Sequence, residues 1–161
     1  MAITKEKKKE IVSNLEKIIA DSGSVVFVNF HGLLVSDASS LRRSLIEDKV
    51  GFLVTKKTLL KKVLNDSKIE GEIPDLEGEL ALSFGRDSIA PARDVYKFQK
   101  ELGKVSILGG IFEGKYKSKK EMTEIASIPS LEILRGMFVN VINSPIQRFA
   151  ISLNEITKIK N

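Results

Sequence analysis

The feature that most constrains the fold is a change of pattern at Pro129. Before it, β-branched and aromatic runs alternate with amphipathic helical segments, which is typical of an α/β layer structure. From Ser130 to Lys160 there is no strand signal, and apolar residues recur at helical spacing. About thirty residues of helix extend ~45 Å, which is longer than the body of a small domain. We therefore expect a globular domain over residues 1–128 and an extended C-terminal helical spine over 129–161.

The first 128 residues are predicted to form a mixed sheet packed with helices. The short apolar runs predict strands over 24–30, 50–55 and 80–84, and one or two strands over 105–114. Helices are expected from about Thr4 to Asp21, from about Ser36 with Leu41, Leu45 and Ile46 buried, over 58–66, and from an N-cap at Ser88 to Leu102. Ser118 and Glu121 have the spacing of a capping box at the start of one more helix.

The spine is predicted to consist of two apolar modules separated by Pro145. Ser144 precedes this proline as an expected N-cap, so the pattern favours two helices. The halves are alike at an offset of 11 residues, since Phe138 matches Phe149 and Ile142 matches Leu153. Residues 131–157 contain only Arg135 and Arg148 as basic groups, which disfavours a membrane-surface helix. Partner helices are the favoured ligand of this face, ahead of packing onto the body.

The net charge of +5 lies within one segment. Residues 42–62 contain seven basic and two acidic groups, an excess of 7 − 2 = +5, and the rest of the chain balances at 19 against 19. A local excess of this kind points to an anionic partner, and Thr58 can add a hydrogen bond to phosphate. Only Phe52 is aromatic within the segment. We therefore expect the segment to recognise the phosphate backbone and the shape of a nucleic acid, and not to stack on its bases.

Two candidate catalytic features are judged coincidental. GGIFEGK at 109–115 matches G-x-x-x-x-G-K, but Tyr116 stands where a P-loop needs Ser or Thr for magnesium, and Glu113 lies where phosphates would be cradled. His31 has no nucleophile or paired carboxylate positioned near it by sequence, so a turn or surface histidine is favoured. The chain lacks cysteine and has one histidine. We expect no enzyme activity, no cofactor, no metal and no small-molecule substrate.

No targeting or membrane segment is recognised. The N-terminal TKEKKKEIVSNLEKII mixes charged with apolar positions, as in an amphipathic helix and unlike a signal peptide. The apolar run at Val25–Val28 is far too short to span a membrane. We expect a cytoplasmic protein.

Four segments together resemble one known family. They are NFHGLLVSDASSLRRSL (29–45), GFLVTKKTLLKKVL (51–64), LGGIFEGKY (108–116) and IPSLEILRGMFVNVINSPIQRF (128–149). In this order and spacing they are similar to the bacterial large-subunit ribosomal protein ten family, the ribosomal stalk-base proteins. The sequence departs from the family's common pattern at His31, often Arg, at Lys57, often Asn, and at Glu79, often Pro. The lysine keeps phosphate binding plausible, whereas His31 weakens a claim of RNA contact there.

The resemblance implies a structural role on the ribosome. The globular domain would bind large-subunit rRNA together with ribosomal protein eleven, and the spine would hold dimers of the acidic stalk protein seven/twelve, which recruit translational GTPases. Two modules predict two dimers. Carried over by position, the rRNA-binding residues are Arg42, Arg43, Lys56, Lys57, Thr58, Lys61 and Lys62. The stalk-protein-binding residues are Leu134, Phe138, Val141, Ile142, Ile146, Phe149 and Leu153.

Overall fold

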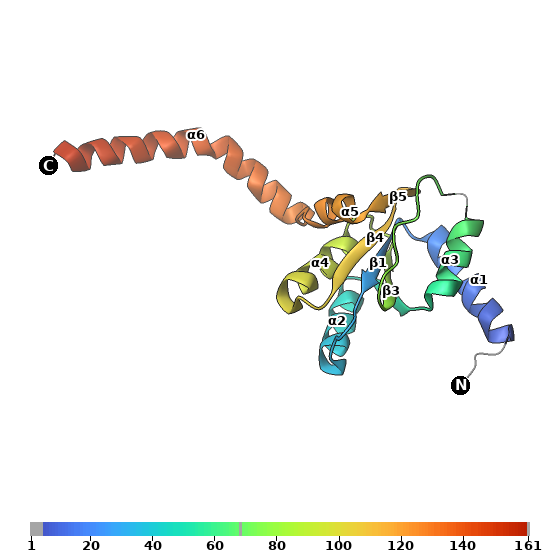
Figure 1. The fold of residues 1–161 in the computed structure, drawn as a ribbon. Coiled ribbons are helices and arrows are strands. Elements are labelled where there is room, and N and C mark those ends of the chain that lie inside the picture. Colours follow the sequence, from blue (N-terminus) through green and yellow to red (C-terminus); the bar gives the residue numbers. More distant parts are fainter. Residues whose placement is uncertain (1–4, 68, 161) are drawn as a thin grey trace. The chain divides into compact units, whose positions relative to one another are not determined.

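The computed structural model describes residues 5–67 and 69–160, and its backbone divides into two compact units, Met1–Ile128 and Pro129–Asn161. The first unit alternates helices and strands along the chain (Figure 1). Its elements are α1 (Lys5–Asp21), β1 (Ser24–Asn29), α2 (Val35–Glu47), β2 (Gly51–Val54), α3 (Lys57–Asp66), β3 (Leu80–Gly85), α4 (Ala90–Leu102), β4 (Ser106–Phe112), β5 (Lys115–Ser118) and α5 (Lys119–Ala126).

The five strands form one sheet in the order β2-β3-β1-β4-β5. Every pair of neighbouring strands is antiparallel, and β1 is central because it pairs with both β3 and β4. The outer strands β2 and β5 are short, as is common for edge strands. The expected α/β body is confirmed, with β5 as a strand that the sequence pattern did not indicate.

Helices cover both faces of the sheet, so the core has two halves. Alternate residues of β1 point to opposite faces: Val26 and Val28 pack with the α2, α4 and α5 side, while Val25 and Phe27 pack with α1 and α3. All four are buried. Figure 1 shows the same layering, with α1 and α3 on one side of the strands and α2, α4 and α5 on the other. Because both faces of the sheet are covered, β1 is apolar at the four consecutive positions 25–28 instead of alternating between apolar and polar.

The second unit is one helix, α6 (Leu131–Lys160), with Pro145 inside it. The prediction that Pro145 separates two helices, with Ser144 as N-cap, was wrong. A proline already has the φ of a helix, so its cost is one lost N–H donor and a clash that bends the helix. Figure 1 shows α6 as a bent but continuous ribbon. All its described side chains, over residues 131–158, are exposed except the half-buried Ser144.

Three smaller expectations in the first unit have different outcomes. Ser88 is not the cap of α4, because the helix begins after Ile89, whose backbone N–H donates to the carboxylate of Asp87 at 3.1 Å. Ile46 is 72% exposed, since Leu41 and Leu45 already fill the buried face of α2. Thr4, the expected cap of the first helix, lies outside the described residues.

Asp94 on α4 is the one buried carboxylate among the described residues, with 1% of its surface exposed. Neither of its carboxylate oxygens accepts a hydrogen bond, and Arg93 and Lys97 lie 3.5 Å away as ion-pair partners. Burial raises the pKa of Asp94, and the carboxylate of Asp48 raises it further, against the lowering effect of the two cations. The folded chain therefore holds this proton more tightly than the unfolded chain does.

This raised pKa predicts a stability that falls with rising pH. Below the pKa of an unfolded aspartate, ~3.9, the neutral acid stabilises the fold fully, and that contribution is lost as pH rises through the raised value. The melting temperature of Asp94→Asn should therefore increase relative to that of the wild type as the pH is raised from 4 to 7.5. The reason is that only the wild type acquires a buried charge without hydrogen-bond partners, and an unsatisfied buried polar group costs about 1–3 kcal/mol. Melting curves at both pH values measure this, with the exposed Asp75→Asn as control. A constant difference between Asp94→Asn and wild type would contradict the assignment.

Candidate nucleic-acid and protein interfaces

The predicted RNA-binding residues all lie around the edge strand β2. We call them the basic edge: Arg42, Arg43, Lys56, Lys57, Thr58, Lys61 and Lys62. Helix α2 precedes β2 on one face of the sheet, and α3 follows it on the other. The arginines and the lysines thus approach the same edge from opposite faces. All are exposed except Lys57, which is half-buried.

On the α2 side, the edge is anchored by a contact between Arg42 and Phe52. The Arg42 guanidinium lies over the Phe52 ring, 5.9 Å from its centroid, within the range of a cation–π interaction. Phe52 is half-buried and packs against the core beneath α2. Its ring is therefore occupied by the protein itself, which agrees with a surface that binds phosphate instead of stacking bases.

On the α3 side, the helix begins without the groups that normally satisfy its first N–H donors. Lys56 is the N-cap residue, it provides no side-chain cap hydrogen bond, and the first turn contains no acidic residue. Its carbonyl oxygen accepts from Leu59 and Leu60, which are inside the helix. The positive end of α3 and the lysines of the basic edge therefore act in the same direction, favouring an anion there.

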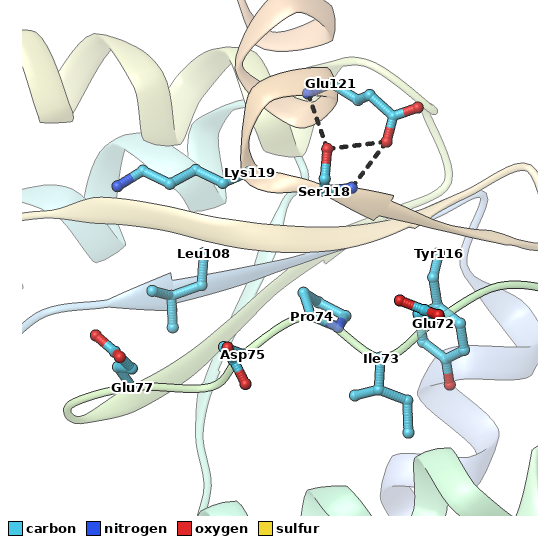
Figure 2. Close-up of a pocket in the computed structure, with 10 residues that line it drawn as sticks. All are labelled: Glu72, Ile73, Pro74, Asp75, Glu77, Leu108, Tyr116, Ser118, Lys119 and Glu121. Carbon is cyan, nitrogen blue, oxygen red and sulfur yellow. Dashed lines mark hydrogen bonds between the residues drawn. The ribbon is translucent and has the colours of Figure 1, made fainter.

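A groove at the opposite edge of the sheet is lined mainly by acidic residues. It has a volume of about 700 Å³ and lies between the loop that precedes β3 and the β4–β5–α5 segment (Figure 2). Its apolar lining includes Ile73, Pro74 and Leu108, and its acidic lining consists of Glu72, Asp75, Glu77 and Glu121. Lys119 also lines the groove, but four carboxylates outnumber it, so this groove would repel phosphate whereas the β2 edge would attract it.

Glu121 in this groove is also a structural residue. Ser118 and Glu121 form the predicted capping box: the Ser118 N–H donates to the Glu121 carboxylate at 2.9 Å, and the Glu121 N–H donates to Ser118 Oγ at 3.5 Å. The Ser118 N–H is also the main cause that lowers the pKa of Glu121, with Lys117 adding to it. The carboxylate therefore stays ionised and the groove stays negative.

The two features judged coincidental have structural explanations. Residues 109–115 form a β-hairpin whose turn consists of Glu113 and Gly114, both at positive φ, so they do not form a phosphate-binding loop. A side chain at Gly110 would lie 2.5 Å from the Val25 carbonyl, which explains the glycine. His31 is exposed in a turn, where its backbone N–H donates to Asn29 Oδ1 at 3.0 Å. No cluster of metal-ligating side chains occurs within the described ranges.

Helix α6 exposes an apolar stripe. The predicted residues Leu134, Phe138, Val141, Ile142, Ile146, Phe149 and Leu153 are between 39% and 69% exposed. Because α6 is continuous, the offset of 11 residues is close to three full turns. Phe149 therefore lies on the same face as Phe138, about 16 Å further along at ~1.5 Å per residue. The structure brings the two modules onto one stripe.

No single helix in the described part of the chain is long and apolar enough to cross a membrane. Only α5 and α6, counted together as a broken span, reach the required length and composition.

The described residues thus present two separate surfaces, a basic sheet edge on one unit and an exposed apolar helix as the other. The family model for ribosomal protein L10 matches residues 3–100. Curated relatives described as large ribosomal subunit protein uL10 include those of Fusobacterium nucleatum, 37% identical over 89% of this chain and 88% of the relative, and Shouchella clausii, 32% identical over 96% and 94%. That of Rhodospirillum rubrum is 31% identical over 92% and 86%.

The chain belongs to the ribosomal protein L10 family, whose members are structural proteins of the ribosome and not enzymes. The family model ends at residue 100, whereas the relatives' alignments extend over most of the chain.

Proposed function

We propose that this chain anchors the stalk of the large ribosomal subunit. In this proposal, the Met1–Ile128 unit binds large-subunit rRNA through the basic edge, and α6 holds dimers of the acidic stalk protein seven/twelve. The observation that carries it is α6 itself, a helix of 30 residues with an exposed apolar stripe. Such a stripe is typical of a surface that a partner covers.

The RNA half of the proposal rests on charge and helix geometry. The basic edge combines two arginines, four lysines and the uncapped start of α3 along one short strand. These groups recognise phosphates and the shape of a folded RNA, and they leave base edges unread. Binding of this kind releases counterions, so affinity falls steeply with salt. For about four to seven neutralised phosphates, log affinity should fall against log salt with a slope between about −3 and −6.

The protein half rests on the stripe of α6. With the exposed Leu131 and Ile156 added, the stripe has five large apolar side chains before Pro145 and four after it. At ~2 kcal/mol for each buried side chain, a module supplies ~8–10 kcal/mol. Association costs on the order of 4–15 kcal/mol, so a module holds a partner when the helix is already formed. Two modules therefore support two stalk dimers, bound about 16 Å apart on one face.

The remaining partners complete the proposed role. The family resemblance supports contact of the body with ribosomal protein eleven, and recruitment of translational GTPases by the bound stalk dimers. Both place the chain on the ribosome, and in a bacterium that is the cytoplasm. A membrane surface is a weaker partner for α6 because Arg135 and Arg148 are the only basic residues over 131–157, whereas interfacial helices carry many.

Truncation tests whether the two functions are separable. A chain ended after Pro129 should lose stalk-protein binding completely and keep RNA affinity within about threefold, because the body and α6 are separate compact units. Native mass spectrometry with the stalk protein and filter binding with large-subunit rRNA measure the two properties. Circular dichroism checks that the truncated body is folded. Simultaneous loss of both activities from a folded body would contradict the modular arrangement.

A further inference from the structure

Lys49, between α2 and β2, occupies a backbone position at which glycine is the usual residue. It has φ of 58°, in the left-handed region. The Val50 N–H donates to the Leu45 carbonyl at 2.8 Å, and the Lys49 N–H donates to the Ile46 carbonyl at 3.0 Å. This pair of hydrogen bonds is a Schellman motif, with Lys49 at its left-handed C′ position. A lysine there costs conformational free energy that a glycine would not.

The Lys49 side chain shares a cavity with two other cations that are distant in sequence. This cavity, of about 270 Å³, is lined by Lys17 of α1, Lys49, and Arg86, which follows β3. Its floor includes the Phe84 ring, which lies so close to Gly51 that a side chain on Gly51 would meet ring atoms at 2.4 Å. Three separate segments thus bring their positive charges to the N-terminal end of β2.

The charges around this cavity are not balanced within the chain. Among the described residues that line it, Asp21 is the only acidic one. Within the described residues, none of Lys17, Lys49 and Arg86 has a carboxylate within 4.0 Å. The C-terminal end of α2 attracts a cation at Lys49, but it gives no reason for Lys17 and Arg86 to gather there. All three side chains are exposed and can reach a ligand.

We infer that this cavity binds a backbone phosphate of the same rRNA that is proposed to contact the basic edge. The inference rests on the proposed function. Lys49 precedes β2 and Lys56 follows it, and this stretch spans at most about 25 Å at ~3.3 Å per residue. The RNA backbone then follows the whole length of the β2 edge, held by the cavity at one end and by the start of α3 at the other.

Lys49→Gly separates a phosphate contact from a merely structural role. The glycine relieves the left-handed strain, so the variant should melt a few degrees higher than the wild type. Loss of one phosphate contact should lower rRNA affinity about five- to tenfold near 0.1 M salt and make the salt slope shallower by about 0.7–0.9. Filter binding of the full chain to large-subunit rRNA over a salt series, with a melting curve, measures both. Lys17→Gln and Arg86→Gln should give the same loss of affinity.

The exposed Lys120→Gln on α5 is the matched control, and it should bind as the wild type does apart from a small general charge effect. If Lys49→Gly melts higher but binds with unchanged affinity and slope, the cavity does not hold phosphate and the inference is overturned. That result leaves the proposed function intact, because the wild type still binds. A wild type that does not bind the rRNA at all would overturn the proposed function and, with it, the cavity.

Discussion

Replacing Phe138 by glutamate is expected to reduce the number of bound stalk dimers from two to one, and replacing Phe149 as well should remove both. Each ring is 67% exposed in the free chain and would be buried at the centre of one module. A buried aromatic anchor is worth about 2–4 kcal/mol at a protein interface, and a buried, unpaired carboxylate adds a further penalty. Affinity at the altered module should therefore fall at least a hundredfold. Native mass spectrometry with the acidic stalk protein gives the stoichiometry directly.

The matched control for this experiment is Ile151→Glu. Ile151 is 57% exposed, yet it lies two residues after Phe149 and so points about 200° around the helix. The same apolar-to-acidic change there should leave both dimers bound. Circular dichroism of each variant checks that α6 remains helical. Equal losses from Ile151→Glu and Phe149→Glu would show that the stripe is not the binding face.

The second large effect concerns the basic edge. Changing Lys56, Lys57, Lys61 and Lys62 together to glutamine should weaken rRNA binding by about two to three orders of magnitude near 0.1 M salt. It should also make the salt slope shallower by about 3, since each neutralised phosphate contributes ~0.7–0.9. The uncapped start of α3 and the two arginines remain, so residual binding is expected. Titration of large-subunit rRNA at several salt concentrations measures both quantities.

A control with the same total charge separates local contacts from net charge. Lys100, Lys104, Lys119 and Lys120 are all exposed, and changing these four to glutamine also lowers the formal net charge from +5 to 5 − 4 = +1. They lie on α4, α5 and the loop after α4, away from β2. This variant should lose affinity only severalfold. If both quadruple variants lose the same affinity, attraction is general and the basic edge is not the site.

The sequence predicted the local structures that depend on short-range patterns. The strand over 24–30 is β1, whose run of buried residues identifies it regardless of partners. The capping box at Ser118 and Glu121 is confirmed because its signal consists of two side chains three residues apart. The continuous α6 was not predicted. A proline within a helical pattern indicates a lost hydrogen bond and a bend. It does not indicate whether the helix continues beyond the proline or ends there.

The candidate sites divide in the same way. The basic edge lies in one stretch of 21 residues, so counting charges along the chain is enough to find it. Lys17 and Arg86 are far from that stretch in sequence, and only the pairing of β2 with β3 and the packing of α1 bring them beside Lys49. The left-handed φ of Lys49 is likewise invisible in the sequence, because no glycine marks the end of α2. No pattern of neighbouring residues in the sequence therefore predicts this cavity.

Under the proposed function, the acidic groove beside β4 and β5 has a consequence for how the body would approach RNA. The β2 edge carries an excess of cations, and the groove is lined by four carboxylates against Lys119, so the charge of this unit is unevenly distributed along the sheet. A polyanion exerts a torque on such a charge distribution while the two are still separated by about a Debye length, ~8–10 Å. If the body binds RNA as proposed, it should be turned before contact, with β2 leading and the groove trailing. Fewer collisions are wasted on wrong orientations, and salt should slow the association as well as weaken the complex.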